Sequence, residues 1–136
     1  MLIESGVFEP LVAERSHGDV DVHEMAIAED LLRQVLAAAA QNQVRRVLSV
    51  ELELGVQRLI VPEALEAAFE ALAEGSVAQG AVLRMVEVPL EARCGGCGAQ
   101  FAPSIDDYAC PRCGEAMAEL LAGHDIILRS LDAETD

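Results

Sequence analysis

Four cysteines in two closely spaced pairs constrain the fold of this 136-residue chain more than any other feature. Cys94 and Cys97 form one C-x-x-C pair, and Cys110 and Cys113 form a second pair twelve residues further on. Two residues between cysteines let both thiolates of one turn reach the same ion, and two such turns supply the four soft ligands of a tetrahedral site. The spacing therefore predicts a metal-binding subdomain at about 90–122.

The metal at these cysteines is expected to be structural zinc. A segment of about 30 residues cannot bury enough apolar surface to fold without a bound metal or another cross-link. Two disulfides or a rubredoxin-like iron centre remain as alternatives for the same four residues. Catalytic zinc is disfavoured, because four cysteine ligands leave no open coordination position.

The charge balance excludes two classes of binding partner. The chain has 24 Asp and Glu against 9 Lys and Arg, a formal net charge of −15. Nucleic acids and anionic membranes both require a basic face, so neither is an expected partner. The first residues show no signal-peptide pattern, and no uncharged apolar run reaches the ~18 residues of a membrane span. The expected location is the cytoplasm, where paired cysteines favour metal over disulfide.

Hydrophobic periodicity predicts two helices and three strands. Helical spacing covers 25–41, alternation covers 46–54, and a second helix runs from Pro62 towards Gly75. Further strands are expected at 81–88 and 124–131. This order predicts an α+β fold: a small three-stranded sheet covered by two helices, with an inserted zinc-ribbon subdomain of two cysteine knuckles.

A His-Glu pair lies where the first helix begins. By composition alone His23 is a solvated residue, and Glu24 forms a capping box with Asp21. If Val22 were the first residue, its amine, the His23 amide nitrogen and the imidazole would form fused chelate rings that suit Ni(II) or Cu(II). The chain has no phosphate-binding loop, no nucleophile elbow and no convincing acid–base set, so we do not expect an enzyme.

From Val22 to about Leu131 the chain resembles the HypA/HybF family of hydrogenase maturation nickel chaperones. The matching segments follow the family's order over nearly the whole chain. They are residues 23–28, 52–55, 62–65 with Phe69, 80–83, 88–89, both cysteine pairs with their glycines, and the closing strand.

The resemblance implies a protein that binds nickel at its N-terminal motif. His23 would be the principal nickel ligand, through its imidazole and backbone nitrogen, with Glu24 beside it. Cys94, Cys97, Cys110 and Cys113 would hold structural Zn(II). Nickel would pass, with a HypB-type partner GTPase, to the large subunit of a [NiFe]-hydrogenase, and some family members also serve urease with its accessory proteins. A zinc-ribbon adaptor without transported metal and a rubredoxin-like electron carrier are the alternatives.

The N-terminus departs from the family pattern. The family begins Met-His-Glu, whereas this chain has Val22 at the methionine position and 21 residues before it. Valine is what a GTG start codon reads as within a longer reading frame, so we expect residues 1–21 to be a mis-called start. The expected division of the chain is 1–21 as an extension, 22–89 with 123–132 as the nickel-binding α/β domain, 90–122 as the zinc-binding subdomain, and 133–136 as a tail.

Overall fold

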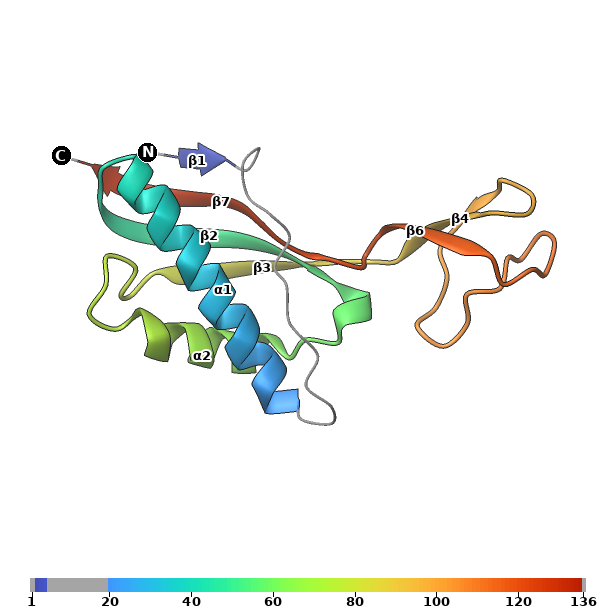
Figure 1. Cartoon of the computed structure of the whole chain (residues 1–136), viewed down its shortest axis with the longest axis horizontal. Helices are drawn as coiled ribbons and strands as arrows, with labels where there is room; N and C mark the ends of the chain where they lie inside the picture. Colours follow the sequence, from blue (N-terminus) through green and yellow to red (C-terminus); the bar gives the residue numbers. More distant parts are fainter. Residues whose placement is uncertain (1, 5–19, 136) are drawn as a thin grey trace.

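The computed structural model describes the backbone of residues 2–4 and 20–135, and the side chains of residues 2–3 and 24–135. Two helices and one 3-10 turn are interleaved with seven strands (Figure 1). The elements in chain order are β1 (Leu2–Glu4), α1 (Val20–Gln41), β2 (Val44–Gly55), η1 (Val56–Arg58), α2 (Pro62–Ala73), β3 (Val82–Val88), β4 (Glu91–Cys94), β5 (Gln100–Phe101), β6 (Ala118–Ala122) and β7 (Ile126–Thr135).

The larger sheet has the strand order β1-β7-β2-β3. Strand β2 pairs antiparallel with β7 and parallel with β3, and the parallel pair is joined by a crossover through η1 and α2. The predicted three-stranded sheet is thus confirmed as β7-β2-β3. The smaller sheet, β5-β4-β6, lies within residues 90–122, which we call the cysteine subdomain.

Strand β1 is a fourth strand of the larger sheet that the sequence analysis did not predict. It pairs antiparallel with β7, with Ile3 opposite Leu131. Ile3 is only 8% exposed and belongs to the hydrophobic core, whereas its neighbour Leu2 is 58% exposed. Residues 2–4 therefore contribute to the fold. The remainder of the expected extension, residues 5–19, lies outside the described part of the chain.

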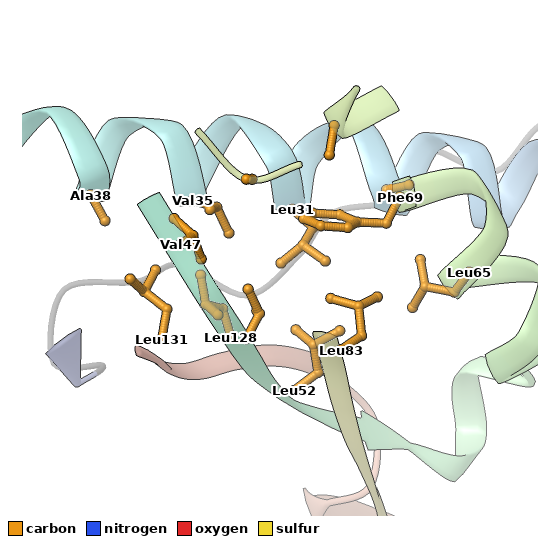
Figure 2. Packing of buried hydrophobic residues seen from close by; sticks show 14 of the residues in the cluster. Leu31, Val35, Ala38, Val47, Leu52, Leu65, Phe69, Leu83, Leu128 and Leu131 are labelled. Atoms are coloured by element: carbon orange, nitrogen blue, oxygen red, sulfur yellow. The ribbon is translucent and has the colours of Figure 1, made fainter. Parts of the chain in front are cut away.

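Both helices pack on the same face of the larger sheet (Figure 2). Leu31 of α1 and Phe69 of α2 face each other above Leu52 of β2, Leu83 of β3 and Leu128 of β7. All of these except Leu83 are at most 1% exposed. The core is almost wholly aliphatic, as the composition predicts, and Phe69 is its only aromatic residue among those described.

The helix boundaries follow local signals in the sequence. Helix α1 ends at Gln41, where the Asn42 side chain donates to the carbonyl of Ala38 (2.8 Å), and Pro62 occupies the first turn of α2. Helix α1 begins at Val20, five residues before the predicted start at 25, which places Asp21 inside the helix. The predicted capping box between Asp21 and Glu24 is therefore wrong.

Two glycines make the junction between the larger sheet and the cysteine subdomain. A Cβ at Gly55 would lie 2.5 Å from the backbone carbonyl carbon of Gly123, and a Cβ at Gly123 would lie 2.6 Å from the Pro89 carbonyl oxygen. Gly123 also has a φ of +86°, which side-chain-bearing residues rarely adopt. The chain entering the subdomain and the chain leaving it thus pass through one point of close backbone contact.

Candidate metal centre

The four cysteines come together at one point of the cysteine subdomain, as the spacing predicts. Their Sγ atoms all lie within 4.8 Å of one another. Among the described side chains, those of residues 2–3 and 24–135, this is the only group of three or more histidine, cysteine or carboxylate side chains that could hold a metal ion. Cys94 and Cys110 are buried, while Cys97 and Cys113 are exposed, so the site opens to solvent on one side.

Each cysteine pair lies on a tight turn closed by glycine. The N–H of Gly98 donates to the carbonyl of Cys94 (2.9 Å), and the N–H of Gly114 donates to the carbonyl of Cys110 (2.8 Å). Both glycines have a positive φ, as expected where such a turn closes. The second turn repeats the first, so the two turns present their sulfurs in the same way.

The distances between the sulfur atoms fit four thiolates that share one metal ion, and they are too long for disulfides. The Sγ atoms of Cys94 and Cys113 are 3.5 Å apart, and those of Cys97 and Cys110 are 3.6 Å apart. A disulfide requires about 2.05 Å. A tetrahedral zinc–thiolate centre with bonds of about 2.3 Å has sulfurs separated by about 3.8 Å. All four cysteines are free, and the two close contacts join one turn to the other.

Backbone amides stabilise thiolates in the protein without metal. The pKa of Cys94 is lowered by the N–H groups of Cys97 and Gly96, and the N–H of Gly96 lies 3.3 Å from its sulfur. The pKa of Cys110 falls to about 7, chiefly because the N–H of Cys113 donates to it, while burial acts in the opposite direction. The sulfur of Cys110 thus becomes a ready ligand near neutral pH.

The pKa of Cys113 shifts in the opposite direction, upwards. The N–H of Glu115 lowers the pKa of Cys113, but the sulfur of Cys94, desolvation and the other two sulfurs raise it to about 12. Four sulfurs this close share protons rather than all ionising together. A bound cation would displace the shared protons and allow all four sulfurs to be thiolates at the same time.

The second pair of predicted site residues lies on α1, apart from the cysteines. Position 23 is in the first turn of the helix, and the His23 side chain lies outside the described part of the structure. Glu24 is 2% exposed. Its Oε1 accepts a hydrogen bond from the N–H of Val61 (3.1 Å), the residue immediately before α2. Its Oε2 is buried and has no hydrogen-bond partner among the side chains and backbone groups that the structure describes.

The segment from Gly55 to Val61 links the start of α1 to the cysteine subdomain. At its far end the N–H of Val61 donates to Glu24, and its middle contacts the subdomain through Gln57, whose Nε2 lies 3.3 Å from the Tyr108 hydroxyl. The N–H of Gln57 also donates to the Gly123 carbonyl (2.9 Å). The sequence analysis missed Gln57, Val61 and Tyr108. Pro62 predicted where α2 starts, but it gave no sign that the Glu24 side chain contacts the residue before it.

His124 does not join the cysteine site. His124 follows the junction glycine and lies 3.4 Å from the Asp125 carboxylate, and His17 is outside the described residues. Among residues 2–4 and 20–135, no helix is both long and apolar enough to cross a membrane.

The fold and the site define a class of protein: a small α+β domain that carries a zinc-ribbon centre of four cysteines. Residues 22–133 match the family described as "Hydrogenase/urease nickel incorporation, metallochaperone, hypA". The chain belongs to this HypA family of nickel metallochaperones for hydrogenase maturation.

Similar proteins cover the same region of the chain. The hydrogenase maturation factor HypA of Azotobacter chroococcum mcd 1 is 37% identical over 113 residues, which is 83% of this chain and 100% of that protein. The HypA of Methanocella arvoryzae is 37% identical over 114 residues, or 83% and 99% of the two chains.

Two solved structures have the same fold. The solution structure of the nickel metallochaperone HypA from Helicobacter pylori has a TM-score of 0.66 and 24% identity, and the match covers 83% of this chain and 98% of that one. The solution structure of another HypA protein has a TM-score of 0.68 and 25% identity, with coverage of 88% and 100%.

Proposed function

We propose that this chain binds one Ni(II) ion at the start of α1, through His23 and Glu24, and delivers it during hydrogenase maturation. The buried carboxylate of Glu24 is the main structural support. Burying a carboxylate oxygen without a partner is costly unless a proton or a cation complements it. Glu24 Oε2 is such an oxygen, and it lies one residue after His23.

A site at a helix start suits a protein that must release its ion. One imidazole, one carboxylate and backbone nitrogen form a partial coordination sphere, so an incoming ligand from an acceptor can replace them one at a time. Four thiolates in one cage would instead retain the ion. We therefore assign Ni(II) to the start of α1 as cargo and Zn(II) to the cysteines as a resident, structural ion.

The proposed recipients follow from the family. A HypB-type GTPase would act with this protein, and the large subunit of a [NiFe]-hydrogenase would receive nickel, with urease and its accessory proteins as a second destination. The chain itself would act without catalysis, in the cytoplasm. In the proposed division, 22–89 with 123–132 binds nickel and 90–122 binds zinc, while β1 and the end of β7 add residues 2–4 and 133–135 to the sheet of the nickel-binding unit.

Calorimetric titration of Ni(II) into the zinc-loaded full chain tests the assignment of the nickel site. We expect one tight site, and His23→Ala is expected to lower its affinity by at least about tenfold, because a strong nitrogen ligand is lost. His124→Ala is the matched control, since His124 lies beside the junction and away from α1. Equal affinity in the His23→Ala variant and the unchanged chain would remove His23 from the site.

Metal analysis tests the assignment of the cysteines. The purified protein is expected to be colourless and to contain one zinc per chain. A red, iron-loaded protein with a reversible one-electron couple would instead support the rubredoxin-like alternative, because four thiolates also suit iron.

The two metal sites are also expected to influence each other. The segment from Gly55 to Val61 makes both the Glu24–Val61 contact, at its last residue, and the Gln57–Tyr108 contact, at its middle. Tyr108→Phe removes the hydroxyl that Gln57 contacts and leaves the ring in place. A measurable change in nickel affinity in this variant is expected, whereas unchanged binding in a folded, zinc-loaded variant would show that this contact carries no coupling.

A further inference from the structure

Strand β3 leaves one edge of the larger sheet open. It is the terminal strand of the order β1-β7-β2-β3, so within residues 2–4 and 20–135 its outer backbone groups have no neighbouring strand (Figure 1). Its seven residues pair with β2 without a register shift, and no proline interrupts them. Proteins usually protect such edges with bulges, prolines, charged side chains or very short strands. Of these features, strand β3 has only the charged side chains of Arg84 and Glu87.

A groove runs beside this open edge, between β3 and α2. Its volume is about 570 Å³. Phe69, Ala81 and Leu83 give it an apolar floor, and three glutamates of α2 and its C-terminal end line its side. These are Glu66, Glu70 and Glu74, spaced four residues apart so that they lie on successive turns. Within residues 2–4 and 20–135, no arginine forms an ion pair with any of them.

The other face of β3 carries exposed apolar side chains. Val82 is 57% exposed and Val86 is 51% exposed, with the exposed Arg84 between them on the same face, while Leu83 is 7% exposed and faces the helices. A strand added beside β3 would therefore meet carboxylates on the groove side, and two valines with one arginine on the opposite side. Because side chains alternate along a strand, the matching segment alternates basic and apolar residues.

We propose that β3 and the groove beside it form a docking surface for an extended, basic–apolar segment of a partner protein, which pairs with β3 as an added strand. The sheet already accepts a short strand at its other edge, where the three residues of β1 pair with β7. Backbone hydrogen bonds to β3 would give affinity, and the three glutamates would select a basic segment. This surface is independent of the proposed nickel site.

A synthetic peptide tests the proposal. The probe is a fluorescein-labelled peptide of about eight residues that alternates arginine and valine, and its binding to the full zinc-loaded chain is followed by fluorescence anisotropy. The triple variant Glu66→Gln, Glu70→Gln, Glu74→Gln is expected to bind it roughly tenfold more weakly, because three ion pairs are lost. The control triple variant Glu91→Gln, Glu115→Gln, Glu119→Gln changes net charge equally within the cysteine subdomain and is expected to bind almost as tightly as the unchanged chain.

Two further peptides separate strand addition from simple charge attraction. A peptide with four arginines followed by four valines has the same composition, and an alternating peptide N-methylated at every residue has no backbone N–H to donate and cannot pair as a strand. Both are expected to bind at least several-fold more weakly, and only the original probe should slow hydrogen exchange of β3 amides. Equal weakening by the two triple variants, or equal binding of all three peptides, would overturn the proposal. Nickel affinity is expected to be the same in both triple variants.

Discussion

The carboxylate of Glu24 accepts a hydrogen bond from the backbone N–H of Val61 across 3.1 Å, and so joins the first turn of α1 to the residue before α2. The two residues are 37 positions apart in the sequence. The bond is partly buried, because Glu24 is 2% exposed whereas Val61 is 45% exposed. One side chain therefore fixes how the two helices begin relative to each other, next to the proposed nickel ligand.

Replacing Glu24 separates its structural role from its charge. Glu24→Ala leaves the Val61 N–H without its partner and is expected to lower the free energy of unfolding by about 1–3 kcal/mol. Glu24→Gln keeps an oxygen acceptor and is expected to cost less, yet to weaken nickel binding if the charge contributes to the site. Urea unfolding of the zinc-loaded chain measures the first effect. Glu29→Ala, at an exposed position of the same helix, is the control and should be nearly neutral. Equal costs for the two alanine variants would contradict a structural role for Glu24.

Removal of zinc should expose an ordered reactivity among the thiols. The pKa of Cys110 is about 7 and that of Cys113 about 12, so directly after zinc is removed, while the two turns keep their folded arrangement, Cys110 is a thiolate above pH 7 and Cys113 stays protonated. Iodoacetamide at neutral pH is expected to modify Cys110 before Cys113, as mapped by mass spectrometry, despite the greater exposure of Cys113. Modification of Cys113 first would contradict the assignment.

The same order sets how zinc affinity depends on pH. Zinc binds thiolates, so protons compete with it, and its apparent affinity falls as pH falls. As pH passes below about 7, Cys110 also becomes protonated, and one additional proton is released for each zinc bound. Competition with a chromophoric chelator between about pH 8 and about pH 6 is expected to show that the apparent zinc affinity falls more steeply with pH below about pH 7. A constant slope from about pH 8 to about pH 6 would mean that Cys110 does not titrate there.

The junction glycines should tolerate no side chain. Gly55 has an ordinary φ of −67°, so alanine there would be harmless but for the clash with Gly123, 2.5 Å from the added Cβ. Gly55→Ala is expected to lower the free energy of unfolding by about 2–4 kcal/mol. Gly75→Ala is the control, because Gly75 has a φ of +83° but open space around it, and backbone strain alone costs about 1 kcal/mol. Thermal unfolding of both variants distinguishes contact from strain, and a cost at Gly55 no larger than that at Gly75 would show that the backbones can move apart.

Two neighbouring residues of β1 test whether the N-terminal strand belongs to the native fold. Ile3 is in the core, and Leu2 is exposed on the opposite face of the same strand. Ile3→Asp is expected to cost about 2–3 kcal/mol of unfolding free energy, against less than about 0.5 kcal/mol for Leu2→Asp. Equally small effects in the two variants would show that β1 contributes little to the stability of the fold.

Much of the fold was predictable because its signals are local. Period-two alternation placed the strand that became β2, and Pro62 marked the start of α2 to the residue. The cysteine spacing predicted the four-sulfur cluster, since two such turns have few other uses in a reducing compartment. Each of these features is encoded within a short stretch of chain.

The missed features all depend on residues far apart in the sequence. Strand β1 is only three residues long and is held by β7 at the other end of the chain, so no periodicity could reveal it. Glu24 was read as a cap of its own helix because Asp21 lies three residues earlier, yet its partner Val61 is set by how the helices pack. The junction at Gly55 and Gly123 depends on backbone proximity, which composition cannot show.

That junction also determines how the cysteine subdomain can move. Both connections to it pass through the contact between Gly55, Gly123 and Leu90, and the subdomain extends away from the sheet beyond this point (Figure 1). The Gln57–Tyr108 contact also joins the subdomain to the segment from Gly55 to Val61, so the subdomain can turn about the glycine contact only as far as this second contact allows. The displacement of a residue should therefore grow with its distance from the contact between the glycines. A partner that binds the two cysteine turns would act far from the two glycines, where a given force turns the subdomain most easily.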